Sequence, residues 1–274
     1  MREKLDASGK NAEEKNKDRF SGFADIYDQV RPEMPEYPIE IITTYLNKKA
    51  DVVVDLGCGP GLSTIAWKHH CNAVIGIEPG DDMFLAANKK ADDTVSFKKA
   101  FAHETGLSSN CADVVICSQS FHWMNPELTL AEVNRILKTG GIFAAVDYDW
   151  PPVCKWEAEA AYKQLFDKVS SLEEEHADLK DSFIRWDKNK YLSNIKNSGF
   201  FRYQREIVFA NRELCDTKRF ISMALSQSGL QSLIQHKPHL IKSALTEYAE
   251  TIQSLFAGET IKADFCYRMR LGIK

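Results

Sequence analysis

The chain has 274 residues, of which 44% are hydrophobic and 27% are charged, and its formal net charge is −4. This length and composition can bury the core of one large α/β domain, and no apolar run approaches the length of a membrane span. Acids and bases are interspersed, without the basic stripe that is typical of nucleic-acid-binding surfaces. We therefore expect neither a nucleic-acid partner nor a membrane.

The N-terminal segment differs in composition from the rest. Residues 1–19 are rich in Lys, Glu, Asp and Asn. Because they lack the apolar stretch of a signal peptide, we expect a flexible, solvated extension before a single domain over 20–274. The seven cysteines are scattered, odd in number and without metal-binding spacing. They predict reduced thiols in a cytoplasmic protein, and no metal site.

Residues 51–61, Asp-Val-Val-Val-Asp-Leu-Gly-Cys-Gly-Pro-Gly, are the most informative stretch. They predict a buried strand, a tight turn and a helix over 62–70. Glycines in the turn let a ligand contact the backbone, since no Cβ intervenes. A dinucleotide fingerprint does not fit, because its third glycine would fall at Leu62, and a phosphate loop does not fit, because no Lys followed by Ser or Thr comes next. The alternative is a glycine-rich turn in an unrelated α/β protein.

Further strands and helices alternate along the chain. Alternating elements predict a mostly parallel sheet covered on both faces, with a site at the carboxyl ends of the strands. The second strand ends at Glu78, 23 positions after Asp55. A carboxylate in that place can accept both hydroxyls of a ribose; the alternative is a solvated strand-end Glu. Strands are expected near 51–56, 73–78, 94–101, 112–118 and 142–148, and helices near 35–49, 62–70, 82–91 and 126–138.

Several motifs resemble those of the class I S-adenosylmethionine-dependent methyltransferases. The pattern D-x-G-x-G-x-G at 55–61 resembles their first motif, and Leu-Lys-Thr-Gly-Gly at 137–141 resembles the turn before their fifth strand. Gln-Ser-Phe-His-Trp at 119–123 and the Tyr…Arg-Pro lead-in at 27–38 resemble a "methyltransferase type 11" branch with a Phe-His-Trp signature, which includes trans-aconitate methyltransferase-like proteins. The resemblance is good over about 20–150 and weak beyond.

The resemblance implies a Rossmann-like fold with a seven-stranded, mostly parallel sheet in the order 3-2-1-4-5-7-6. Strands over 201–210 and 263–273 would form its antiparallel edge. The core would comprise about 35–150, 200–210 and 262–274. C-terminal insertions, about 151–198 and 212–258, would form a helical cap that sets acceptor specificity.

The resemblance also implies S-adenosyl-L-methionine as cofactor and S-adenosyl-L-homocysteine as product. The residues expected at the cofactor are Asp55, Gly57, Cys58, Gly59, Gly61, Glu78, Met83, Ala102, His103 and Ser118. Those expected in the substrate pocket are Tyr27, Arg31, Gln119, Trp123, Tyr148 and Trp150.

The expected function is methyl transfer to a small-molecule acceptor, at O, N or a carboxylate, by in-line displacement. His122 is the candidate general base, because its unperturbed pKa is near 6.5; alternatively it only lines the pocket. Arg31 could pair with a substrate carboxylate or with a surface acid. The competing functions are an RNA methyltransferase and a non-catalytic cofactor-binding protein, and the chain is expected to be a monomer or a homodimer.

Overall fold

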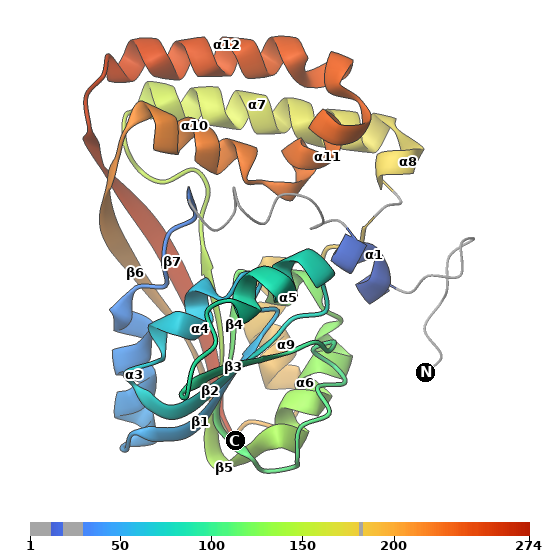
Figure 1. The fold of residues 1–274 in the computed structure, drawn as a ribbon, viewed down its shortest axis with the longest axis vertical. Helices are drawn as coiled ribbons and strands as arrows, with labels where there is room; N and C mark the ends of the chain where they lie inside the picture. Colours follow the sequence, from blue (N-terminus) through green and yellow to red (C-terminus); the bar gives the residue numbers. More distant parts are fainter. Residues whose placement is uncertain (1–11, 19–29, 181–182) are drawn as a thin grey trace.

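The computed structural model describes residues 12–18, 30–180 and 183–274, and one seven-stranded sheet lies at its centre (Figure 1). The strands are β1 (Ala50–Leu56), β2 (Cys71–Ile77), β3 (Val95–Lys98), β4 (Ala112–Ser118), β5 (Leu137–Tyr148), β6 (Tyr203–Cys215) and β7 (Ile261–Ile273). Their order is β3-β2-β1-β4-β5-β7-β6, and β7 alone runs antiparallel to its two neighbours. The predicted strand order is confirmed.

Helices cover both faces of this sheet, as alternating strands and helices predict. One face packs against α3 (Glu36–Leu46), which contributes Ile39 and Ile42 to the core. The other packs against α6 (Pro126–Ile136) and α9 (Tyr191–Asn197). The α6 helix begins where the Asn125 side chain accepts hydrogen bonds from two backbone N–H groups of the first turn, with Pro126 at the first helical position. Two shorter helices follow β1 and β2, namely α4 (Leu62–Ala66) and α5 (Asp81–Asn88).

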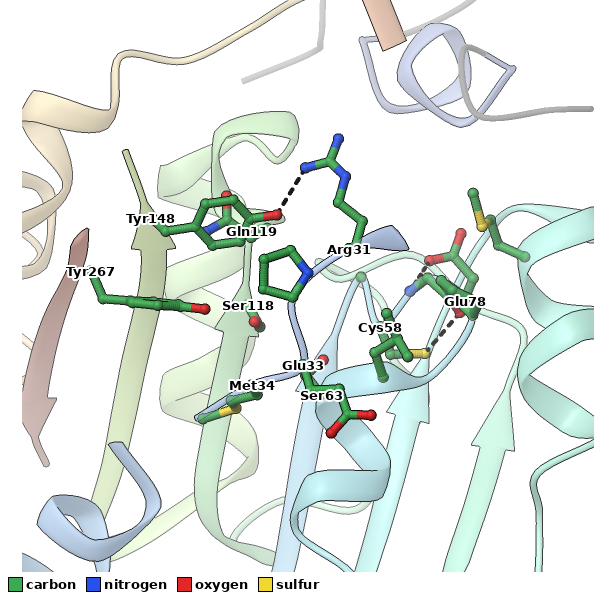
Figure 2. Close-up of a pocket in the computed structure, with 16 residues that line it drawn as sticks. Arg31, Glu33, Met34, Cys58, Ser63, Glu78, Ser118, Gln119, Tyr148 and Tyr267 are labelled. Carbon is green, nitrogen blue, oxygen red and sulfur yellow. Dashed lines mark hydrogen bonds between the residues drawn. The ribbon is translucent and has the colours of Figure 1, made fainter. Parts of the chain in front are cut away.

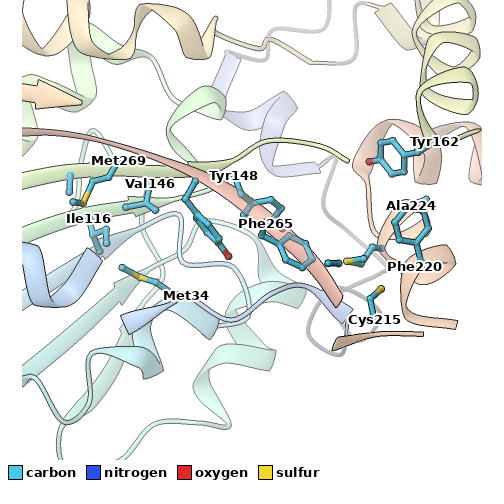
Figure 3. Close-up of a cluster of buried hydrophobic side chains, with 14 of the residues drawn as sticks. Met34, Ile116, Val146, Tyr148, Tyr162, Cys215, Phe220, Ala224, Phe265 and Met269 are labelled. Atoms are coloured by element: carbon cyan, nitrogen blue, oxygen red, sulfur yellow. The ribbon is translucent and has the colours of Figure 1, made fainter. Parts of the chain in front are cut away.

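A layer of four helices lies beyond the carboxyl ends of the strands, at the top of Figure 1. It consists of α7 (Trp156–Glu175), α10 (Thr217–Leu225), α11 (Ser228–His236) and α12 (Pro238–Phe256). Figure 3 shows that buried side chains run without a break from the sheet at Val146, past Phe265, into this layer at Phe220. The layer is therefore held to the sheet by a shared hydrophobic core. No described helix combines the length and the apolarity needed to cross a bilayer.

The edge strands are longer than the sequence predicts. β6 and β7 pair along their whole length, from Tyr203 opposite Ile273 to Cys215 opposite Ile261. The backbone groups of each strand find their hydrogen-bond partners in the other strand, so the length of both strands depends on pairing between segments that are distant in the chain. By the same principle β5 begins at Leu137, directly after α6, because Leu137 pairs with Ala112 of β4.

Two segments differ from the expected domain boundaries. α9 falls within the segment expected to belong to the cap, yet it buries Tyr191 and Ile195 beside Phe143 and Phe201 on the sheet. The N-terminal extension is expected to be flexible, but residues Ala12–Asp18 form α1 and Asn16 is buried. Asn16 contacts residues more than a hundred positions later in the chain, and α9 contacts the sheet rather than the helical layer. The sequence alone shows neither contact.

Candidate active site

The glycine turn after β1 is held against β2. The backbone N–H groups of Gly57 and Cys58 both donate to the carbonyl oxygen of Ile77, at 2.8 and 3.1 Å. Gly57, Gly59 and Gly61 all have positive φ angles, of 65°, 55° and 90°. Side chains other than glycine are disfavoured in that conformation. The turn therefore depends on its three glycines for backbone reasons before any ligand is considered.

The three glycines differ in what a side chain would meet. A Cβ at Gly57 would lie 2.5 Å from the Cε atom of Met124, and one at Gly61 would lie 2.9 Å from the ring of Phe97. A Cβ at Gly59 has no atom within 4 Å. Only Gly59 thus faces open space, and the other two are constrained by packing inside the protein.

Asp55 lies beneath the turn, fully buried. Its Oδ2 atom accepts hydrogen bonds from the hydroxyls of Ser63, at 2.6 Å, and Thr64, at 2.7 Å. Burial raises the pKa of Asp55 to about 6. The carboxylate therefore ties the end of β1 to the start of α4, and it acts on the site through the shape of the turn.

Glu78 follows β2 and stands beside the turn, 8% exposed (Figure 2). Its Oε2 atom accepts from the Gly59 N–H at 2.9 Å, and its Oε1 atom accepts from the Gly80 N–H at 2.7 Å. Burial raises the pKa of this carboxyl to about 7, against the lowering effect of those two bonds. Each oxygen keeps a second lone pair, so the carboxylate can still accept from a bound ligand.

A cavity of about 730 Å³, counted out to its mouth, opens at the carboxyl ends of β1, β2 and β4 (Figure 2). Residues from six segments line it: Arg31, Pro32, Glu33, Met34, Gly57, Cys58, Gly59, Pro60, Leu62, Ser63, Glu78, Met83, Ser118, Gln119, Tyr148 and Tyr267. We call it the first cavity.

Most of the residues expected at the cofactor line the first cavity, but four do not. Those present are Gly57, Cys58, Gly59, Glu78, Met83 and Ser118. Asp55 and Gly61 lie behind the turn, where the carboxylate binds Ser63 and Thr64 and the glycine packs against Phe97. Ala102 is buried in the core cluster of the sheet, and the His103 ring stacks on that of Phe101 with centroids 5.6 Å apart.

Tyr267 is a lining residue that the sequence did not predict. It lies on β7, directly opposite Tyr148 on β5, and the two rings are 5.3 Å apart. Its buried hydroxyl has no hydrogen-bond partner among the described residues. No motif marks this tyrosine, because its place follows from the pairing of β5 with a strand more than a hundred residues later.

A second cavity, about 710 Å³ out to its mouth, adjoins the first beneath the helical layer. The two share Arg31 and Gln119 as lining residues. Of the expected substrate residues, Trp123 and Trp150 line the second cavity and Tyr148 lines the first; Tyr27 lies outside the described residues. The remaining lining residues of the second cavity are His122, Phe166, Val169, Ser170, Glu173, Phe183, Arg185, Lys188, Gln227, Ser228 and Gly229.

Arg31 stands between the two cavities. Its guanidinium donates to the Tyr148 hydroxyl at 3.1 Å and to the Ser226 carbonyl at 2.9 Å. It also lies over the Trp150 ring, 5.1 Å from its centroid. These contacts join the sheet to the helical layer and fix a positive charge at the point where the two cavities meet.

His122 lies in the short helix η1 (Phe121–Trp123) and is buried, with 5% of its surface exposed. Its Nδ1 atom is 3.7 Å from the Oδ1 atom of Asp147, and the Nζ atom of Lys188 lies 2.8 Å from the same oxygen. Burial and the nearby cations Lys188, Arg185 and Arg31 hold the pKa of His122 well below its usual value. The imidazole is therefore neutral at neutral pH and is a proton acceptor.

Asn16 of α1 connects the N-terminal segment to this cavity. Its amide nitrogen donates to the carbonyls of Trp123 and Ile184, both at 2.7 Å, and its Oδ1 atom accepts from the Ile184 N–H at 2.9 Å. Ile184 lies between Phe183 and Arg185, which both line the second cavity. The segment that carries those two side chains is thus anchored by one buried asparagine.

Asn16→Ala is expected to loosen this anchor. The change leaves the Ile184 N–H and two carbonyls without their partner, so exchange of the Ile184 amide hydrogen should become at least about tenfold faster, since a net loss of about 1.4 kcal/mol is tenfold. Hydrogen–deuterium exchange over 183–187 measures this. The control is Asn72→Ala, which removes an exposed hydrogen bond to Asp51 and should leave that segment unchanged. Equal exchange in both variants would contradict the anchor.

Comparisons with known proteins agree with this geometry. Residues 54–145 match the family model of a methyltransferase domain. A presumed methyltransferase of Dictyostelium discoideum is 24% identical over 177 residues, which is 61% of this chain and 66% of that protein. The probable S-adenosylmethionine-dependent methyltransferase CRG1 of Saccharomyces cerevisiae is 33% identical over 131 residues, which is 46% of this chain and 45% of the yeast protein. Both matches thus span less than two thirds of the relative's length.

Solved structures share the fold. A presumed type II methyltransferase from Anaeromyxobacter dehalogenans has a TM-score of 0.66 at 18% identity, over 89% of this chain and 97% of that one. Phosphoethanolamine N-methyltransferase 2 of Haemonchus contortus, solved with phosphomonomethylethanolamine and S-adenosylhomocysteine, has a TM-score of 0.52 at 14% identity, over 92% of this chain and 56% of that one. At these identities the likenesses show that the chain shares the fold of these methyltransferase structures.

Proposed function

We propose that this protein transfers a methyl group from S-adenosyl-L-methionine to a small-molecule acceptor by in-line displacement. The observation that carries the proposal is the pair of adjoining cavities that meet at Arg31 and Gln119. A donor in the first cavity and an acceptor in the second would face each other across this junction. Holding two reactants in such an arrangement accounts for a large part of the catalysis that a displacement needs.

The first cavity fits the cofactor by two features. Gly59 presents bare backbone to open space, and Glu78 presents a buried carboxylate that can accept from ribose hydroxyls. Met83 from α5 supplies an apolar wall for an adenine ring. When bound, the cofactor supplies a methyl group on a sulfonium, which is already a good leaving group.

The second cavity supports a small acceptor over RNA. It lies beneath α7 and α11, which supply Phe166, Val169 and Gln227 to Gly229 at its wall, and the chain carries a net charge of −4. These helices also exclude water from the reacting groups. His122, held beside Asp147, would accept a proton from a hydroxyl or amine acceptor. The Phe-His-Trp turn supports the methyltransferase type 11 branch with trans-aconitate methyltransferase-like members, and seven free cysteines support a cytoplasmic setting.

The direct test is transfer of a radiolabelled methyl group from S-adenosylmethionine. The protein is incubated with the labelled cofactor and either a pool of small metabolites or total RNA. We expect label in the metabolite fraction only. Label in RNA would support the RNA methyltransferase instead, and binding of S-adenosylhomocysteine without transfer to either pool would support a non-catalytic cofactor-binding protein.

A further inference from the structure

The second cavity collects positive charge in a chain that is negative overall. Three cations line it: Arg31 precedes α3, whereas Arg185 and Lys188 come from the segment after α8 (Ala177–Lys180). The carboxylates nearby are Glu173 in the lining and Asp147 on β5, which is ion-paired with Lys188 at 2.8 Å. With His122 neutral, these three cations and two carboxylates give the described part of the cavity a net positive charge, whereas the formal net charge of the whole chain is −4.

Hydrogen-bond donors also outnumber acceptors there. The Cζ atom of Arg185 lies over the Trp123 ring, 5.7 Å from its centroid, and a guanidinium carries five N–H donors. The buried Nε2 atom of Gln119 has no acceptor among the described residues, while its Oε1 atom faces the Nζ atom of Lys188 at 3.4 Å. A buried donor without an acceptor costs free energy unless a ligand supplies one. Among the described residues the cavity therefore has an excess of donors and of positive charge, which the oxygens and the charge of an oxyanion would balance.

We propose that the methyl acceptor is an organic anion, and that Arg185, Lys188 and the Gln119 amide bind its carboxylate or phosphate group in the second cavity. This proposal rests on the proposed function, because it identifies the class of molecule that would be methylated. Guanidinium groups pair with such oxyanions through two parallel hydrogen bonds, which fix orientation as well as position. With its anionic end held there, the acceptor presents its other end to the junction with the first cavity. A neutral analogue should bind more weakly, since it leaves the positive charge of Arg185 uncompensated and forms no charge-assisted hydrogen bond with it.

The experiment measures anion binding to protein saturated with S-adenosylhomocysteine. The probes are glutarate and glycerol 2-phosphate, and their uncharged counterparts are glutaramide and glycerol. Isothermal titration calorimetry should show binding of at least one anion and of neither neutral compound. The tighter of the two anions distinguishes a carboxylate acceptor from a phosphorylated one.

Arg185→Gln is the decisive variant. Arg185 is an exposed residue, so the substitution should not disturb folding. Loss of the guanidinium should weaken anion binding by about tenfold to a hundredfold, the scale of a charged hydrogen-bonded contact. The matched control is Lys190→Gln, which removes a positive charge two residues from Lys188 at an exposed position outside the cavity. Its anion affinity should equal that of the wild type.

Two results overturn the inference. One is the absence of anion binding in protein that binds S-adenosylhomocysteine. The other is equal weakening in Arg185→Gln and Lys190→Gln, which would indicate a diffuse surface effect. Failure to bind S-adenosylhomocysteine at all would instead overturn the proposed function, so the two failures are distinguishable in one titration series.

Discussion

Gly59→Val is expected to weaken S-adenosylhomocysteine binding by at least about a hundredfold, or about 2.7 kcal/mol. A side chain at Gly59 meets no protein atom within 4 Å and points into the first cavity, where the cofactor is proposed to touch the backbone. The Gly59 N–H also donates to Glu78, so a displaced turn would move the carboxylate. Isothermal titration calorimetry on the folded variant measures the loss.

The control must carry the same backbone strain without reaching the cavity. Gly199 has a φ of 72° and open space at its Cβ position, like Gly59, but it follows α9 and lines neither cavity. Gly199→Val should therefore cost a similar 1–2 kcal/mol or so of stability and leave cofactor affinity unchanged. Wild-type affinity in Gly59→Val would remove this glycine from the cofactor site.

The same titration depends on pH through Glu78. Its pKa is about 7 in the free protein, and ribose hydroxyls donate to the carboxylate, so binding favours the deprotonated form. Affinity should therefore rise as the pH rises from about 5.5 and level off above about 8. Glu78→Gln should bind more weakly, and its affinity should not change over this range.

His122→Ala is expected to lower kcat by about 10²- to 10⁴-fold with little change in S-adenosylhomocysteine affinity, if the imidazole takes the acceptor's proton. His122 lines the second cavity and not the first, which is why cofactor binding should be retained. His103→Ala is the matched control, because that imidazole stacks on Phe101 outside both cavities. A raised KM with kcat retained would instead identify His122 as a binding residue.

The pH profile of the wild type adds a second readout. A base must be deprotonated, and the pKa of His122 is lowered in the free protein, so kcat/KM should rise with pH and reach its plateau at a lower pH than an unperturbed imidazole would give. The charged groups that act on His122 are Lys188, Arg185 and Arg31, and the Asp147 carboxylate lies 3.7 Å from its Nδ1 atom. A bound anion would offset the three cations and raise the pKa, so kcat should level off at a higher pH than kcat/KM. Identical profiles in wild type and His122→Ala would exclude the base.

Local signals predicted the parts of the first cavity that lie close together in the chain. The turn at Gly57 to Gly61, Glu78 at the end of β2 and Ser118 at the end of β4 each follow a buried strand, and parallel strands bring their carboxyl ends to one edge. The sequence did not show that Met124 and Phe97 occupy the space a side chain would need at Gly57 and Gly61. Which of the three glycines has open space beside it depends on those distant side chains.

The sequence by itself determined the parallel core and the carboxylate beside the glycine turn, since these depend on periodicity and short spacings. The strand order was implied by the family resemblance. Only the tertiary structure decided which distant segments meet around the two cavities. It brought Arg31 to the junction, placed Tyr267 opposite Tyr148, and joined Arg185 and Lys188 to His122 beneath the helical layer. These residues come from segments that pack together at long range, and the contacts that join them are set by shape and burial, which no local pattern records.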